Sequence, residues 1–191
     1  MQLTELAPFL QEYTATHTQK ASSEILKKYE QKVPAALLAL WEHYGFGKYN
    51  HGILEIVNPD DFNDTLWTWL GKEVATYTPI AINGFGDLFY YRQLGNEEED
   101  VCMITPHYRD ITNCCWSLTG FFNHIVCDKE FIDSVLRKEL FTAAIKRYGE
   151  LSGNESFHFV PALAIGGTES LDTLQKGNTQ IHLDILFQIG S

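Results

Sequence analysis

The sequence is short of basic residues and has no long apolar run, and each shortage excludes a class of protein. Its 191 residues include 14 Lys and Arg against 25 Asp and Glu, which gives a net charge of −11 with histidine neutral. Phosphate backbones and anionic lipid repel so acidic a chain, so we expect no direct binding to nucleic acid or to a membrane. No stretch approaches the roughly 18 apolar residues of a transmembrane helix, so no membrane span is predicted.

Cysteine is also scarce. The four cysteines, Cys102, Cys114, Cys115 and Cys127, form no CxxC pair, and the vicinal pair does not readily close a disulfide. The first residues contain no basic segment followed by a long apolar one, so the sequence predicts no secretory signal. Reduced thiols without a signal favour a cytoplasmic protein.

The abundant residues describe a folded domain. Hydrophobic residues make up 45% of the chain and charged residues 20%, which excludes a disordered tail, a collagen-like fibre and a small disulfide-stapled protein. A chain of this length forms one ordinary domain, or two small lobes that pack together.

The negative charge is concentrated in the middle of the sequence. Residues 33–128 hold four basic and 13 acidic residues, a net charge of −9, whereas residues 1–32 are neutral and residues 129–191 carry −2. One interpretation is a soluble surface that resists self-association. The other is an electrostatic face for a cationic protein, with an association that slows as salt is added.

Helical patterns fill the first third of the chain. Residues 3–13 and 22–31 have helical spacing, and Ser22 or Ser23 is the expected N-cap of the second helix. Pro34 stands where the first turn of a further helix begins, and Gly45 is expected to end that helix.

Short β-rich runs separated by turn residues follow. The expected strands cover Ile53–Val57, Pro79–Asn83, Asp87–Arg92 and Val101–Thr105, with Tyr108–Thr112 as a further candidate. A short helix over Phe62–Leu70 is expected after a cap at Asp60 or Asp61. The tract Gly95–Asp100 is expected to form the solvated tip of a hairpin.

The last third is helical again. Ser117 and Asp128 each cap an expected helix, the first with a full apolar stripe and the second continuing to Gly149. An extended run over Phe157–Ala162 and an apolar run over Ile181–Ile189 close the chain. The predicted fold class is α+β, with N-terminal helices, a central and mostly antiparallel sheet, and C-terminal helices packed on it.

No motif for catalysis stands out. The chain has no GxSxG nucleophile elbow and no GxxxxGK[ST] phosphate loop. The GxG of Asn83–Asp87 joins two expected strands, so we interpret it as a turn. The seven histidines form no HxH or HExxH pair. The sequence therefore predicts no catalytic residue, no metal and no cofactor, as expected of a protein that is not an enzyme.

Two acidic clusters are candidate contacts for a basic partner. The first is Asp60, Asp61 and Asp64; helix capping accounts for two of them, although paired carboxylates can also hold a hard cation or do acid–base work. The second cluster lies in the most acidic segment and consists of Glu97, Glu98, Glu99 and Asp100.

One tryptophan joins these candidates. Trp67 and Trp69 are two residues apart on the expected helix, so they cannot share a face, and one of them should be exposed. We select Trp69 as a possible rigid anchor of an interface.

Two parts of the chain resemble known families. Residues 33–47 (VPAALLALWEHYGFG) and 52–59 (GILEIVNP) resemble the opening of GAD-like domains, and residues 79–88 fit the same pattern. Residues 157–167 (FHFVPALAIGG), with residues 182–186 beyond them, resemble the C-terminal domain of type VI secretion DNase-immunity proteins. We therefore expect a GAD-like region over 1–112 and an immunity-protein C-terminal region over 113–191, packed as one compact unit.

The resemblance implies a cytosolic immunity protein that binds and neutralises a cognate antibacterial toxin, which in that family is a DNase. A nuclease must present a cationic surface to hold DNA, and an acidic protein can occupy that surface. The family's motifs mark no toxin contacts, so the residues above are candidates on charge alone. The alternatives are a small-molecule-binding or regulatory module on the same fold, and an enzyme that uses the Asp60–Asp64 cluster or a cysteine–histidine pair.

Overall fold

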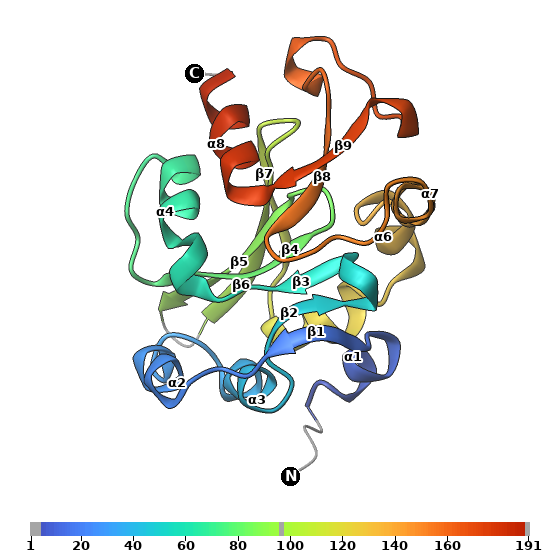
Figure 1. Ribbon diagram of the computed structural model, residues 1–191. Coiled ribbons are helices and arrows are strands. Elements are labelled where there is room, and N and C mark those ends of the chain that lie inside the picture. Colours follow the sequence, from blue (N-terminus) through green and yellow to red (C-terminus); the bar gives the residue numbers. More distant parts are fainter. Residues whose placement is uncertain (1–4, 96–97, 190–191) are drawn as a thin grey trace.

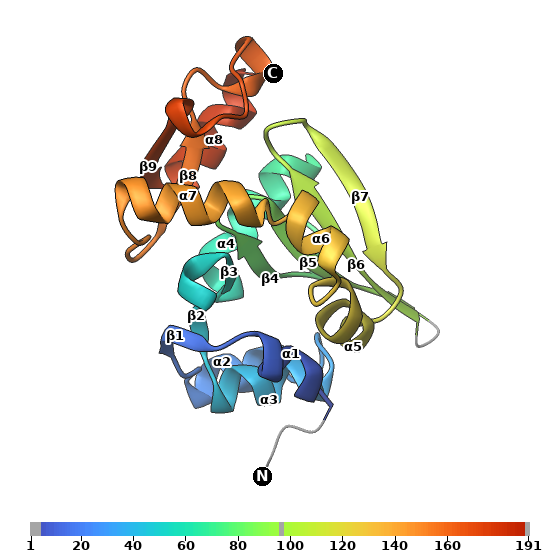
Figure 2. The ribbon, with the colours of Figure 1, turned by 90° about the vertical axis from the view of Figure 1, so that its right-hand side faces the viewer.

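An antiparallel sheet lies at the centre of the protein, between two sets of helices (Figures 1 and 2). The computed structural model describes residues 5–95 and 98–189. Within these ranges seven strands pair in chain order, each antiparallel to the next. The strands are β1 (Ala15–Gln19), β2 (Phe46–Tyr49), β3 (Leu54–Ile56), β4 (Tyr77–Asn83), β5 (Leu88–Gly95), β6 (Glu98–Thr105) and β7 (Asp110–Cys115).

Local signals set the helices of the N-terminal part. The hydroxyl oxygen of Ser22 accepts a hydrogen bond from the amide of Ile25 and caps the second helix, as expected. Gly45 follows the third helix with φ +91°, a conformation that glycine adopts without strain. The helices here are α1 (Ala7–Glu12), α2 (Ser23–Tyr29), α3 (Ala35–His43) and α4 (Pro59–Leu70).

The C-terminal part adds helices and a separate hairpin. Ser117 and Asp128 cap their helices through the amides of Gly120 and Phe131, as expected. The elements are α5 (Leu118–Gly120), a π-helical turn (Phe121–Ile125), α6 (Lys129–Ser134), α7 (Lys138–Tyr148), β8 (Glu155–Phe159), β9 (Leu174–Asn178) and α8 (Thr179–Ile189). No helix of the described residues is long and apolar enough to span a membrane.

The two faces of the sheet bury different side chains. Along β5, Leu88 and Tyr90 point to one face, whereas Phe89 and Tyr91 point to the other, as the period of two in a strand requires. The first face is covered by α4 and α8, and Leu183 of α8 joins that smaller core. The α+β class and the helices packed on the sheet are therefore confirmed.

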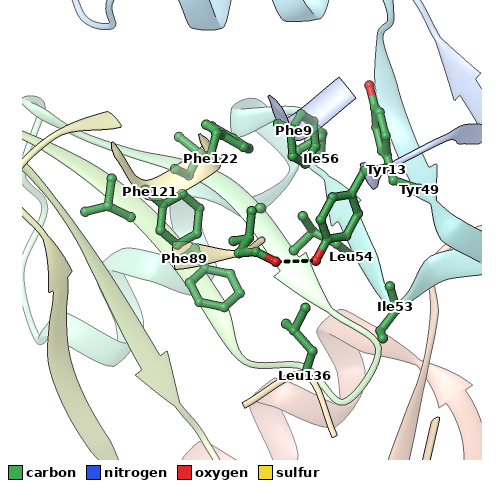
Figure 3. Packing of buried hydrophobic residues seen from close by; sticks show 14 of the residues in the cluster. Phe9, Tyr13, Tyr49, Ile53, Leu54, Ile56, Phe89, Phe121, Phe122 and Leu136 are labelled. Carbon is green, nitrogen blue, oxygen red and sulfur yellow. Dashed lines mark hydrogen bonds between the residues drawn. The ribbon is translucent and has the colours of Figure 1, made fainter. Parts of the chain in front are cut away.

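The larger core packs the N-terminal segment against the helices that follow the sheet (Figure 3). The hydroxyl of Tyr13 donates a 2.6 Å hydrogen bond to the carbonyl oxygen of Val126, and both residues are buried. The ring of Phe9 stacks on Tyr13 and meets Phe122 edge-on, with ring centroids 4.9 Å apart in each case. Removing the N-terminal helices would therefore expose the core that the C-terminal helices cover.

The GxG motif forms a turn, as expected. The side-chain oxygen of Asn83 accepts hydrogen bonds of 3.0 Å from the amides of Phe85 and Asp87, which is how asparagine closes a tight turn. The carbonyl oxygen of Gly84 accepts from the amide of Phe157, so the turn also binds the start of the C-terminal hairpin.

Several expected boundaries were wrong, because tertiary contacts overrode local pattern. The cap of α4 is Asn58, which allows Pro59 to take the first helical position, so the helix begins before Asp60 and Asp61. The helix expected from Asp128 to Gly149 is broken at Arg137, where φ is +50°. The break allows Leu136 to enter the core while Arg137 reaches the β4–β5 turn.

Two strands of the sheet were not expected at all. The first helix occupies only Ala7–Glu12, and the polar run that follows forms the edge strand β1. β1 pairs with β2, a four-residue strand with Gly47 and Lys48 at its centre, and neither strand has the alternating apolar residues by which a strand is recognised in sequence.

Candidate interaction surface

The residues predicted from charge lie on two separate elements, the helix α4 and the β5–β6 hairpin. Asp60 is the most constrained of the α4 set: its carboxylate accepts hydrogen bonds from Lys28 Nζ at 2.6 Å and from the Tyr29 hydroxyl at 2.7 Å. Although burial alone would raise it, these two donors hold the pKa of Asp60 below its usual value. The carboxylate of Asp60 is therefore paired with groups of the protein itself.

Asp61 and Asp64 are exposed on α4 and point outward. Within residues 5–95 and 98–189, neither carboxylate takes part in an ion pair. Residues three apart on a helix lie on one face, so the two charges reinforce each other.

Trp69 is half-buried, and so is Trp67, so the expectation that one of them is exposed was wrong. Trp69 is covered because it contacts α8, and the sequence pattern of α4 alone does not reveal that contact. The indole of Trp69 meets the ring of Phe187 edge-on, with centroids 5.4 Å apart.

In the hairpin cluster, Glu99 and Asp100 are bound to groups of the protein itself. Glu97 lies outside the described residues. Glu98 is exposed. The carboxylate of Glu99 accepts from the Tyr91 hydroxyl and from the amide of Leu118, at 2.9 Å each. Asp100 is fully buried and accepts from Arg92 Nε at 2.7 Å. The expected hairpin is confirmed, but the expected solvated tip extended too far, because Glu98, Glu99 and Asp100 belong to β6 and Asp100 is buried; residues 96–97 lie outside the described residues.

The helix α8 places a further carboxylate and an apolar stripe beside α4, and the charge analysis missed both. The side-chain amide of Gln180 donates to the carbonyl oxygen of Asp61, which fixes the side of α8 that faces α4. Asp184 is exposed one turn after Gln180 and lies on that same side. Further round the helix, away from α4, lie three exposed isoleucines, Ile181, Ile185 and Ile189.

We call the outward surface of these two helices the α4–α8 face. It consists of Asp61, Asp64, Asp184, Ile181, Ile185 and Ile189. Figure 1 shows α4 and α8 side by side at the edge of the molecule. The signal in the sequence is that Ile181–Ile189 holds more apolar residues than one buried helix stripe needs.

Other exposed apolar residues lie elsewhere, and Trp116 is the most exposed of the large ones that the described residues include. Trp116 follows β7, and 71% of its surface is exposed. β7 is at the end of the sheet and its residues are mostly exposed. Trp116 is therefore the rival to the α4–α8 face as an anchor for a partner.

A groove of about 900 Å³ lies between β1, β2, the start of α4 and the segment 150–154. The buried cation within it is Lys48, whose Nζ donates to Glu55 at 2.8 Å. The remaining lining mixes both signs of charge with polar groups, among them Lys20, Asp61 and Glu150. The groove offers space for a ligand but no unpaired charge at its base.

Three histidines cluster between the sheet and the C-terminal hairpin. The rings of His158 and His182 stack with centroids 4.2 Å apart, and His107 lies 5.7 Å from His182. Burial lowers the pKa of all three, that of His182 to about 3. Among the described residues, no group of three or more His, Cys, Asp or Glu is placed to hold a metal ion.

Burial favours the protonated form of three thiols, those of Cys102, Cys114 and Cys127. Burial raises the pKa of Cys102 and Cys127, and that of Cys114 to about 12. A protonated thiol is a weak nucleophile, so these cysteines lack the activation that a cysteine–histidine pair would need.

The chain matches two family models. Residues 5–104 match the GAD-like domain, and residues 117–190 match the model described as T6SS immunity protein Tdi1, C-terminal. The fold is similar to that in the crystal structure of Atu4351 from Agrobacterium tumefaciens, with a TM-score of 0.73 and 15% sequence identity, over 95% of this chain and 88% of that one. A comparison with curated proteins found no match.

The chain belongs to the GAD-like family, because that model matches more than half of it. Its C-terminal part carries the domain of type VI secretion immunity proteins. Both expected resemblances are confirmed.

Proposed function

We propose that this protein is a cytoplasmic immunity protein that binds a cognate type VI secretion toxin, a basic nuclease, and neutralises it by protein–protein contact. The observation that carries the proposal is the match of residues 117–190 to the immunity-protein C-terminal domain. The net charge of −11 supports a cationic target.

The physical basis is electrostatic competition. A nuclease holds its substrate through cationic groups that contact phosphates. An inhibitor with unpaired surface carboxylates is attracted to the same groups, and its association is faster at low salt. We therefore propose that contacts come from exposed carboxylates such as Asp61, Asp64 and Glu98. Asp60, Glu99 and Asp100 act on the fold through their internal partners.

The experiment is capture followed by reconstitution. Tagged protein is used to recover partners from cells of the source organism at low and at high salt, and mass spectrometry identifies them. A recovered basic polypeptide is then purified and assayed for DNA cleavage with and without an equimolar amount of this protein. We expect a one-to-one complex, loss of cleavage, and release at high salt. Cleavage that continues in the presence of the protein would overturn the proposal.

A small-molecule-binding module is the second candidate, and the groove near Lys48 is the observation that favours it. Thermal denaturation in the presence of a panel of polar metabolites tests it, because a ligand that binds the folded state raises the melting temperature. Variants of Asp61 or Glu150 that change such a shift would place the ligand in the groove.

A further inference from the structure

The helix α8 carries two apolar stripes, although a surface helix needs only one. His182, Leu183 and Leu186 are buried against the rest of the protein. Ile181, Ile185 and Ile189 follow one another at intervals of four residues and are 61%, 46% and 37% exposed. A row of exposed isoleucines on a rigid element is the kind of apolar patch that marks an interaction site.

Carboxylates border this stripe on the side of α4. Asp184 lies next to Ile185 on α8, and Asp61 and Asp64 lie on the adjoining helix. None of the three takes part in an ion pair within the described part of the chain. Several cations lie near this region, among them Lys20, which lines the same groove as Asp61, and Lys32, which lies near Asp60. Lys28 is paired with Asp60, and Arg109 donates to the carbonyl oxygen of Phe187 near the C-terminal end of α8.

We propose that the α4–α8 face is the surface on which the cationic toxin docks, with the isoleucine stripe as its apolar centre and the three aspartates as its rim. This inference rests on the proposed function and assigns its contact surface. An interface with a desolvated apolar centre and a charged rim is typical of specific protein complexes. The face also spans both family regions, since α4 lies in the GAD-like match and α8 in the immunity-domain match.

The charges favour a cationic protein over a second copy of this chain. In a twofold dimer the same patch would face itself. The rim aspartates of one copy would then meet those of the other, and like charges placed together oppose association. A partner with lysines and arginines around an apolar centre complements both parts of the face.

The two parts of the face should act on different rate constants. Rim charges steer the encounter and mainly change the association rate and its dependence on salt. Apolar contacts form after the encounter and mainly change the dissociation rate. This division distinguishes a docking face from a general effect of net charge.

The test uses four variants of the full chain. Ile181→Ser/Ile185→Ser removes the centre, and serine and isoleucine have similar helix propensities, so the helix should be kept. Asp61→Asn/Asp64→Asn/Asp184→Asn removes the rim. The control Glu24→Gln/Glu130→Gln/Glu139→Gln removes the same charge from exposed positions on α2, α6 and α7, and Trp116→Ser removes the rival anchor. Circular dichroism and thermal unfolding confirm that each variant is folded.

Binding is measured by stopped-flow or surface-based kinetics against the purified toxin domain identified by capture, made inactive by mutation. We expect the serine pair to raise the dissociation rate at least about tenfold, with little change in the association rate. The aspartate variant should lower the association rate several-fold at low salt and flatten its dependence on salt. The glutamate control and Trp116→Ser should leave both rates near those of the unaltered protein.

The possible failures are distinguishable. In one case the unaltered protein inhibits the toxin while the serine pair binds it equally well, and in another the glutamate control weakens binding as much as the aspartate variant does. Either result would show that the α4–α8 face is not the contact surface, and the immunity function would stand. If no captured toxin is inhibited, the proposed function falls and this inference with it. If sedimentation shows a dimer that the serine pair dissociates, the stripe is an interface between copies, and the proposal is overturned.

Discussion

The guanidinium of Arg137 donates a 2.7 Å hydrogen bond to the carboxylate of Asp87, and this contact joins the C-terminal helices to the β4–β5 turn. Asp87 is fully buried, and the side chain of Arg137 is 10% exposed. Asn83 donates to the same carboxylate oxygen at 2.7 Å, and the Nε of Arg137 donates to Glu169. The pair thus connects the segment that matches the GAD-like model with the segment that matches the immunity domain.

Removing this arginine should strongly destabilise the protein. Arg137→Ala leaves the buried carboxylate of Asp87 without its cation, and breaking a buried ion pair in this way typically costs about 3–5 kcal/mol. Urea unfolding followed by tryptophan fluorescence measures the change. The matched control is Arg147→Ala, whose ion pair with Asp172 is exposed and should leave the free energy of unfolding nearly unchanged. Equal effects of the two variants would contradict this account.

The histidine cluster predicts a loss of stability in mild acid. Burial lowers the pKa of His107, His158 and His182 in the folded protein, to about 3 for His182, whereas an unfolded histidine titrates near its ordinary value of about 6.5. Below that pH the unfolded chain binds protons that the folded protein excludes. The stabilisation is therefore complete above about pH 6.5 and is lost progressively as the pH falls.

From His182 alone, we expect the free energy of unfolding to be about 2 kcal/mol lower at pH 5 than at neutral pH. Urea titrations between pH 7.5 and 5 measure it. His182→Gln should make the profile shallower, and His124→Gln, at an exposed histidine, should leave its slope unchanged. A flat profile for the unaltered protein would show that the folded protein takes up protons over this pH range as readily as the unfolded chain, and would contradict the lowered pKa of the histidines.

The hydrogen bond between Tyr13 and the carbonyl oxygen of Val126 predicts a further effect. Tyr13→Phe keeps the ring that stacks on Phe9 but leaves the carbonyl oxygen of Val126 without the donor it has in the fold. An unsatisfied buried acceptor costs about 1–3 kcal/mol. Chemical denaturation should show a loss in this range, and an unchanged midpoint would mean that the bond contributes nothing net to stability.

Substitutions at two glycines allow the cost of backbone strain to be compared with the cost of steric crowding. Gly47 has φ +127°, and a Cβ there would lie 2.1 Å from the carbonyl oxygen of His17 on the paired strand. Gly47→Ala should therefore cost more than the roughly 1–3 kcal/mol of backbone strain alone and should disrupt the β1–β2 pairing. Gly71 has φ +68° with open space around it, so Gly71→Ala should cost only about 1–2 kcal/mol. Thermal unfolding of both variants checks the order, and equal losses would refute the crowding argument.

Local signals were the part of the fold that could be predicted best from the sequence. Ser22, Ser117 and Asp128 cap helices where their positions indicated, because a cap is decided by residues within one turn. The short β-rich run after the Gly84–Gly86 turn likewise placed β5, and its residues are buried on both faces of the sheet. Polar edge strands such as β1 carry no such pattern and were missed.

The candidate site was predicted less well. Net charge pointed to a cationic partner, and Asp61 and Asp64 are exposed as that requires. Neighbours distant in sequence decided the other carboxylates: Arg92 and Asn113 enclose Asp100, the amide of Leu118 takes up Glu99, and Lys28 pairs with Asp60. Charge counted along a chain does not show which charges are neutralised in space.

By itself, the sequence determined the fold class, the caps at Ser22, Ser117 and Asp128, the β4–β5 turn and the family, because these depend on residue type and on spacing within short segments. Only the tertiary structure decided which acids remain free, that the helix expected from Asp128 to Gly149 breaks at Arg137, and that α8 packs beside α4 with three isoleucines exposed. Those features arise from contacts between separate elements, such as Gln180 with Asp61 and Arg137 with Asp87, and no local pattern records them.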